Sequence, residues 1–197
     1  MKRALGKMAG EKKIVLILLA LAVAFSIYGH SMVWSEWYYP TFGNTNVHVA
    51  FAKYMLTHFS YPLGNDFSYG GGIPALYVPG YRIALAIAGG IFGIDLAQRL
   101  LVMLFALMLP VGFFLFAREL FGDYAGVIAA FFASLPTELL VYTVRPLPQA
   151  FGLALLPFAF YAIAANRRKL ALILTLAIAL VHQEAIAFLA AGAFAFA

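Results

Sequence analysis

Side chains able to take part in acid–base or ionic chemistry are scarce in this sequence. The chain has 197 residues, with 8 acidic residues and 4 histidines. A polar or charged group at membrane depth is costly, so such groups usually line a cavity or pair with one another. By their types and settings, the candidate site residues are Glu36, Asn44, His48, Asp66, Arg82, Arg145, Gln149, His182 and Glu184.

Two of these residues are candidate general bases. Asp66 lies beside a glycine-rich segment that ends in Gly70-Gly71-Gly72, and Glu36 follows a long apolar run. A carboxylate can act as a general base by taking a proton from a substrate group. The alternative readings are that Asp66 is only a turn residue and that Glu36 only solvates a helix end.

Other candidates suit the binding of a substrate phosphate. Arg145 stands in a short turn made rigid by Pro146 and Pro148, where a fixed guanidinium can hold a phosphate at a membrane surface. We assign the same role to Arg82 and His48, although His48 is equally consistent with an idle residue on a wet helix face.

Three polar residues, His182-Gln183-Glu184, interrupt an apolar run near the end of the chain. An idle trio is unexpected at that depth, so we expect these side chains to face a cavity or a substrate. Glu184 is also the candidate metal ligand.

The composition indicates a membrane protein, because 64% of the residues are hydrophobic and only 11% are charged. Apolar runs of about 18 residues or more recur, which predicts an all-α polytopic membrane protein. The net charge of +5 is spread without a basic stripe, so we expect no nucleic-acid partner. Cysteine is absent, which excludes disulfides and thiol chemistry.

The first span is predicted over residues 14–34, within a segment 1–34 that carries five basic residues among its first 13. A signal peptide is the alternative, but the run is long enough to span and lacks a small-residue cleavage site. We therefore expect an uncleaved helix with a cytoplasmic N-terminus, so that the long first loop is extracytoplasmic.

Residues 35–95 form that loop, and two helices lying parallel to the membrane are predicted within it. Over 44–59 the apolar residues follow one helical face, and His48 lies off that face. Residues 61–74 are predicted to be irregular because of their glycines and prolines. Residues 76–94 read as a second interfacial or re-entrant helix.

Further spans are predicted in residues 96–197, over 100–117, 124–141 and 147–165. Basic residues usually flank spans on the cytoplasmic side, and this topology places most of them there. The bases on that side are Lys2, Arg3, Lys7, Lys12, Lys13, Arg118, Arg167, Arg168 and Lys169. The last apolar run, 170–197, stops without a cap or tail, so we expect a longer protein with its C-terminal part missing, or further subunits.

This plan resembles the GT-C glycosyltransferases, which include the protein O-mannosyltransferases and the catalytic subunits of oligosaccharyltransferase. The shared features are an inside-anchored span, a long external loop with two flat helices and a polar outer turn. The fragments that carry the likeness are Phe42-Gly43-Asn44-Thr45, Tyr61-Pro62, Tyr77-Val78-Pro79-Gly80, the turn Arg118–Gly122, and Arg145-Pro146-Leu147-Pro148-Gln149.

The resemblance implies a GT-C-like helical bundle that transfers a sugar from a polyprenyl-phosphate donor to an acceptor hydroxyl or amide at the outer membrane face. Some members of the family use a divalent metal ion to hold the phosphate, so the candidate cofactor is a Mg or Mn ion. The sequence departs from the family where acids are expected, with Asn44 and Gln149 in their places. An amide cannot take a proton or bind a metal strongly. The alternatives are therefore a catalytically inactive subunit that binds a lipid carrier or scaffolds a complex, and a transporter.

Overall fold

The structure, a computed structural model, describes residues 2–36, 45–65, 73–74, 77–135 and 138–195 of the chain. Within these ranges the chain is all-helical apart from one very short strand pair, as predicted. The helices are α1 (Lys2–Glu36), α2 (Thr45–His58), α3 (Gly80–Phe92), α4 (Ile94–Phe121), α5 (Asp123–Ser134), α6 (Glu138–Thr143), α7 (Pro148–Ala164), α8 (Arg168–Val181) and α9 (Gln183–Ala195).

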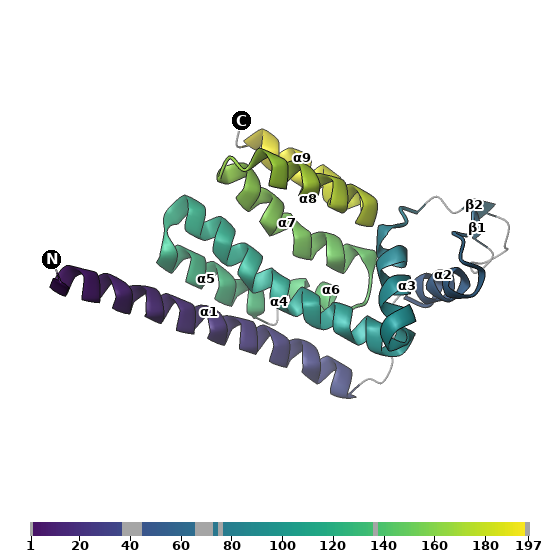
Figure 1. Cartoon of the computed structure of the whole chain (residues 1–197), viewed down its shortest axis with the longest axis horizontal. Coiled ribbons are helices and arrows are strands. Elements are labelled where there is room, and N and C mark those ends of the chain that lie inside the picture. Colours follow the sequence, from purple (N-terminus) through teal and green to yellow (C-terminus); the bar gives the residue numbers. More distant parts are fainter. Residues whose placement is uncertain (1, 37–44, 66–72, 75–76, 136–137, 196–197) are drawn as a thin grey trace.

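The longer helices lie side by side along the long axis of the molecule, with α1 on one side and α8 and α9 on the other (Figure 1). The helix α4 is central and packs against α1, α5 and α7. Its apolar residues therefore meet neighbours on several sides, and Leu101, Phe105 and Leu109 are buried. A helix that is hydrophobic all round is stable only in such a surrounded position or in lipid.

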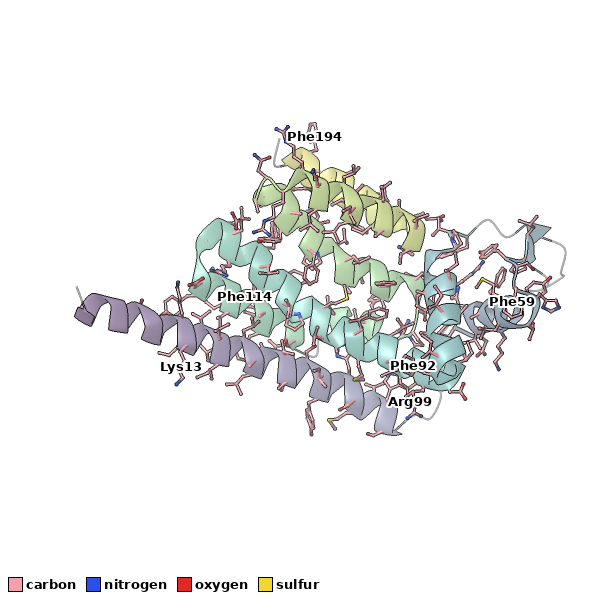
Figure 2. All side chains as sticks on the ribbon, viewed as in Figure 1. Lys13, Phe59, Phe92, Arg99, Phe114 and Phe194 are labelled. Carbon is pink, nitrogen blue, oxygen red and sulfur yellow. The ribbon has the colours of Figure 1, made fainter. Side chains whose placement is uncertain are left out.

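A second apolar cluster joins α1 to α4 and α5. Val15 and Ala22 of α1 pack against Phe114 of α4 and Val127 and Ala130 of α5. Figure 2 shows Phe114 within the bundle, whereas the side chain of Lys13 points away from it. The opposite flank of α1 exposes large apolar side chains, which are Ile14, Leu16, Ile17, Leu21, Phe25, Tyr28 and Met32.

The helix α3 lies across one end of the bundle, and α2 lies beyond it (Figure 1). One residue, Gly93, separates α3 from α4 and has φ of +81°, a conformation that glycine adopts without strain. Gly80, at the start of α3, approaches the backbone carbonyl of Leu180 so closely that a Cβ atom would clash with it. The chain turns sharply at Gly93, between α3 and α4. The start of α3 packs against the end of α8.

Three expectations from the sequence need correction. The predicted single span 124–141 is wrong, because α5 ends at Ser134 and a separate short helix, α6, begins at Glu138. The predicted irregular segment 61–74 contains the strands β1 (Gly64–Asn65) and β2 (Ile73–Pro74), which pair antiparallel. The span predicted over 100–117 is longer at both ends, over Ile94–Phe121.

Two helices of the described part are long and apolar enough to cross a membrane, over Glu11–Ser35 and Ile94–Phe121. Length and composition alone support this, and a buried core helix or a signal sequence would share both features. The start of α1, the α4–α5 connection and the α7–α8 connection lie at one end of the bundle (Figure 1). The turn between α6 and α7 lies at the opposite end, with α2 and α3.

Replacement of Phe105 by alanine tests the packing of α4 against α7. Phe105 is fully buried and stacks on Phe151, with 5.4 Å between the ring centroids. We expect Phe105→Ala to lower the free energy of unfolding by about 3–5 kcal/mol. Leu107→Ala, at an exposed position of the same helix, should change it by about 0.5 kcal/mol. Denaturation by SDS in mixed micelles, followed by circular dichroism, measures both, and equal losses would contradict the packing.

Candidate functional site at the end of the bundle

The α6–α7 turn and the helix ends that flank it, residues 143–149, are held in place by side chains from two other helices. His30 of α1 has its Nε2 atom 3.0 Å from the Thr143 hydroxyl, and Trp34 Nε1 donates to the Val144 carbonyl at 3.2 Å. Tyr81 of α3 donates its hydroxyl to the Pro146 carbonyl. Because His30 Nδ1 lies 2.7 Å from the Ser26 carbonyl, it carries the proton, and Nε2 accepts from Thr143.

Arg82 of α3 is the centre of an aromatic and polar cluster with His48. Its side chain is only 3% exposed. Its Nε donates to His48 Nδ1 at 3.2 Å, and its Nη1 donates to the Tyr61 hydroxyl at 2.7 Å. Its Cζ atom lies 3.6 Å from the centroid of the Phe51 ring and 5.5 Å from that of Tyr77.

This buried guanidinium has no carboxylate beside it in the part of the chain that the structure describes. The two ion pairs found there join Arg118 to Asp123 and His182 to Glu184. Arginine does not lose its proton in proteins, so Arg82 stays charged. The aromatic rings offset part of the desolvation cost, but a buried cation without an anion remains expensive.

His48 is neutral in this setting. Burial lowers the pKa of its imidazole to about 3, and the positive charge of Arg82 and a smaller contribution from His182 act in the same direction. Its Nδ1 accepts from Arg82, so the proton of the neutral ring is on Nε2. The predicted position of His48 on a wet helix face is wrong, because α3 and the residues before it cover that side of α2.

Tyr77 connects this cluster to the end of α8. Its ring centroid lies 5.5 Å from that of His48 and 6.2 Å from that of His182. Burial, with Glu184 adding to it and Arg82 opposing it, raises the pKa of the Tyr77 hydroxyl to about 12. The buried hydroxyl has no hydrogen-bond partner among the described residues.

An apolar groove between α2 and α3 leads to the same cluster. Its volume is about 370 Å³. Its lining residues are Met55, Leu56, Phe59, Tyr61, Ile83 and Ile87, with Ser60 and Ala86. Tyr61 both lines the groove and accepts the hydrogen bond from Arg82. The groove therefore ends beside the buried cation, and Figure 2 shows Phe59 at this end of the molecule.

A second cavity, of about 400 Å³, opens between α7 and α9. Its polar lining residues are Gln149, His182 and Glu184, and the rest of its wall is Tyr142, Leu153, Ala185 and Phe188. Gly152 of α7 lies against His182 and Ala185, where a Cβ atom would come within 3.1 Å of each. The absence of a side chain there lets His182 pack closely on α7.

The structure thus brings together two groups of the predicted site residues. His48 and Arg82 are in direct contact, and Gln149, His182 and Glu184 line one cavity. Arg145 lies on the connecting turn, with its Cζ 5.7 Å from the Tyr142 ring centroid. Asn44 and Asp66 fall outside the described residues. Glu36 is the last residue of α1, and its side chain is not described.

Sequence reasoning missed the aromatic residues that build the site. Tyr77 and Tyr81 contact His48, and Tyr142 forms a wall of the second cavity. For Tyr77 and Tyr81 the available signal was the density of aromatic residues in the loop 35–95. Phe51 was placed correctly on the apolar face of its helix, but not as the ring beneath a guanidinium.

The predicted divalent metal does not fit the residues that the structure describes. These contain no group of three or more His, Asp or Glu side chains that could hold a metal ion. Glu184 has one nitrogen ligand nearby, His182, at 4.0 Å. A stable Mg²⁺ or Mn²⁺ site usually needs several oxygen ligands.

Comparison with known proteins adds no assignment. No family model, no curated protein and no solved structure matches this chain at a significant level. The resemblance to GT-C glycosyltransferases therefore stays a prediction from the sequence, and the site has to be interpreted from its own geometry.

The protonation state of His48 provides a test of this geometry. We expect its imidazole to stay neutral down to about pH 3, because burial and Arg82 disfavour the charged form. The unfolded chain takes up this proton near pH 6.5. The contribution to stability is therefore complete above pH 6.5 and is lost as the pH falls from 6.5 toward 3. NMR of ¹⁵N-histidine, with His48→Gln to assign the signal, measures this, and titration near pH 6.5 would contradict burial beside a cation.

Proposed function

We propose that this chain is an integral membrane protein that binds a polyprenyl-phosphate sugar carrier at the end of the bundle formed by α2, α3 and the α6–α7 turn. The phosphate contacts Arg82, and the prenyl chain lies in the groove between α2 and α3. The expected reaction is transfer of the sugar to an acceptor hydroxyl or amide at the outer membrane face.

The buried charge of Arg82 is the observation that carries this proposal. Arg82 is 3% exposed, and its guanidinium makes two hydrogen bonds, lies near two aromatic rings and lacks an anion among the described residues. A phosphate supplies the missing charge and accepts strong hydrogen bonds from arginine. A ligand carboxylate would also supply a negative charge and accept hydrogen bonds from arginine. The neighbouring groove therefore decides between a phosphate and a carboxylate ligand.

The groove favours a lipid phosphate over a soluble anion. It is lined by aliphatic and aromatic side chains and ends at Tyr61, one hydrogen bond from Arg82. Apolar surface gains about 25 cal/mol for each Å² that is removed from water. A ligand with a phosphate head and a long hydrocarbon chain would use both features at once.

The membrane setting rests on α1 and α4, which are long and apolar enough to span. The large apolar side chains exposed along α1 would face lipid. Basic residues gather at the end of the bundle opposite the site, around Arg118 and Arg167. Under the positive-inside rule that end is cytoplasmic, which puts the site on the outer face.

For the transfer step, a carboxylate of the long loop, Asp66 or Glu36, would remove the proton of the acceptor. Arg82, Arg145 and His182 would stabilise the departing lipid phosphate. These roles come from the resemblance to GT-C enzymes. A subunit that binds the carrier without catalysis is the second candidate, and it is favoured by the amides Asn44 and Gln149 where the family has acids.

Binding to lipid tests the role of Arg82. We expect Arg82→Gln to weaken binding to phosphatidylcholine vesicles that contain polyprenyl phosphate by about 10- to 100-fold, because a charge-assisted hydrogen bond contributes about 1.5–3 kcal/mol. Lys53→Gln removes an exposed cation from α2 at the same end of the molecule and should change binding less than twofold. Co-flotation with the vesicles measures both variants.

A second variant keeps this test decisive if Arg82→Gln fails to fold. Ile87 is exposed and lines the groove, so Ile87→Trp should fill the groove without disturbing the core. It should reduce binding of polyprenyl phosphate but leave binding of inorganic phosphate unchanged. A folded Arg82→Gln protein that binds like the wild type would overturn the phosphate assignment.

Transfer from a labelled lipid-linked sugar in reconstituted vesicles separates the two candidates. We expect Asp66→Asn or Glu36→Gln to reduce transfer by at least 100-fold, as loss of a general base does. Unchanged transfer in both variants would remove both base assignments. Carrier binding without any transfer by the wild-type protein would support the non-catalytic subunit.

A further inference from the structure

The cavity between α7 and α9 is distinct from the groove that would hold the prenyl chain, and of the residues assigned to the phosphate only His182 lines it. It is lined by Tyr142, Gln149, Leu153, His182, Glu184, Ala185 and Phe188, and the groove shares none of these residues. We propose that this cavity is a second binding site, for a small ligand that carries a primary ammonium group on an apolar body.

The charge of the cavity wall points to a cation. Glu184 is its one charged lining residue, and no lysine or arginine lines it in the part of the chain that the structure describes. The carboxylate is mostly exposed, with a side-chain exposure of 74%, which places it at the mouth of the cavity. An ammonium group bound there would gain an ion pair with Glu184.

The remaining polar groups of the wall offer hydrogen-bond acceptors. Gln149 Oε1 is buried without a hydrogen-bond partner among the described residues. Burial lowers the pKa of His182, with Glu184 opposing the shift, so the imidazole is neutral and one ring nitrogen can accept. An ammonium has three N–H donors, which can be shared among a carboxylate, an amide oxygen and an imidazole nitrogen.

The rest of the wall is apolar and suits the body of such a ligand. Leu153 and Ala185 form the inner wall, and the rings of Tyr142 and Phe188 lie nearer the mouth. Aromatic faces also attract cations. The guanidinium of Arg145 lies near the Tyr142 ring, so the ligand's ammonium is expected on the side of Glu184.

Three probes of similar size and different charge test this inference. We expect benzylamine to bind the protein in dodecyl maltoside, benzyl alcohol to bind more weakly, and benzoate not to bind. Titration calorimetry measures the three affinities. Benzoate binding as tightly as benzylamine would overturn the assignment of an ammonium site.

Substitutions then localise the binding. Glu184→Gln should weaken benzylamine about three- to tenfold, in line with a partly exposed ion pair, and change benzyl alcohol less than twofold. Phe188→Ala should weaken both probes, because it removes wall surface from an exposed position. Glu119→Gln removes an exposed carboxylate of α4 outside the cavity and should change neither probe. Equal benzylamine affinity in Glu184→Gln and the wild type would refute the site.

Two further measurements identify the source of the ammonium and keep the two proposals apart. Phosphatidylethanolamine, added to the micelles, should displace benzylamine if the natural ligand is a lipid headgroup, whereas a site for free amines is unaffected by it. Binding of polyprenyl phosphate should be unchanged in Glu184→Gln. Loss of that binding in Glu184→Gln would show that the two cavities form a single site and would overturn the inference of a second one.

Discussion

Hydrogen bonds from α1 and α3 to the α6–α7 turn hold the end of the bundle in its present shape. His30, Trp34 and Tyr81 bond to Thr143, Val144 and Pro146. The turn carries Arg145 and leads into Gln149, so the cavity between α7 and α9 depends on its position. Most of these bonds join residues more than 100 positions apart in the chain, and each is largely removed from water. A buried polar group left without a partner would cost about 1–3 kcal/mol, which makes other positions of the turn unfavourable.

The buried guanidinium of Arg82 explains the character of its surroundings. Burial and, to a smaller extent, the charge of Arg82 lower the pKa of His48 and keep it a neutral acceptor. Two aromatic rings lie near the guanidinium, and Nη1 donates to the Tyr61 hydroxyl. Such an arrangement contributes little to stability, because desolvation of the charge offsets much of what the contacts gain. The arrangement around Arg82 is therefore better explained by ligand binding than by a contribution to stability. The groove beside it and the separate cavity near Glu184 have opposite charge, which allows two unlike ligands at one end of the molecule.

Much of the helical architecture was predictable from the sequence. The helix predicted over 44–59 is observed over Thr45–His58, and that predicted over 76–94 is observed as α3 over Gly80–Phe92. Periodicity and apolar run length carried these predictions, since both report on local backbone structure. An incorrect helix prediction is the single span over 124–141. Residues 124–141 are mostly apolar, yet in the sequence Pro136 stands between α5 and α6, and proline cannot donate a backbone hydrogen bond within a helix.

The sequence alone determined the helical class and the approximate bounds of most helices, because helix formation depends on neighbours within a few residues. Its composition also determined the shortage of polar groups. The candidate site was decided by the tertiary structure. His48 lies off the apolar face of α2, and periodicity therefore places it toward water. The structure buries it, because α3 folds back over α2 and brings Arg82 into contact across 34 positions. Likewise, Gln149, His182 and Glu184 meet only because α9 packs on α7. Contacts of this kind depend on how whole helices are arranged, and local sequence patterns do not contain that information.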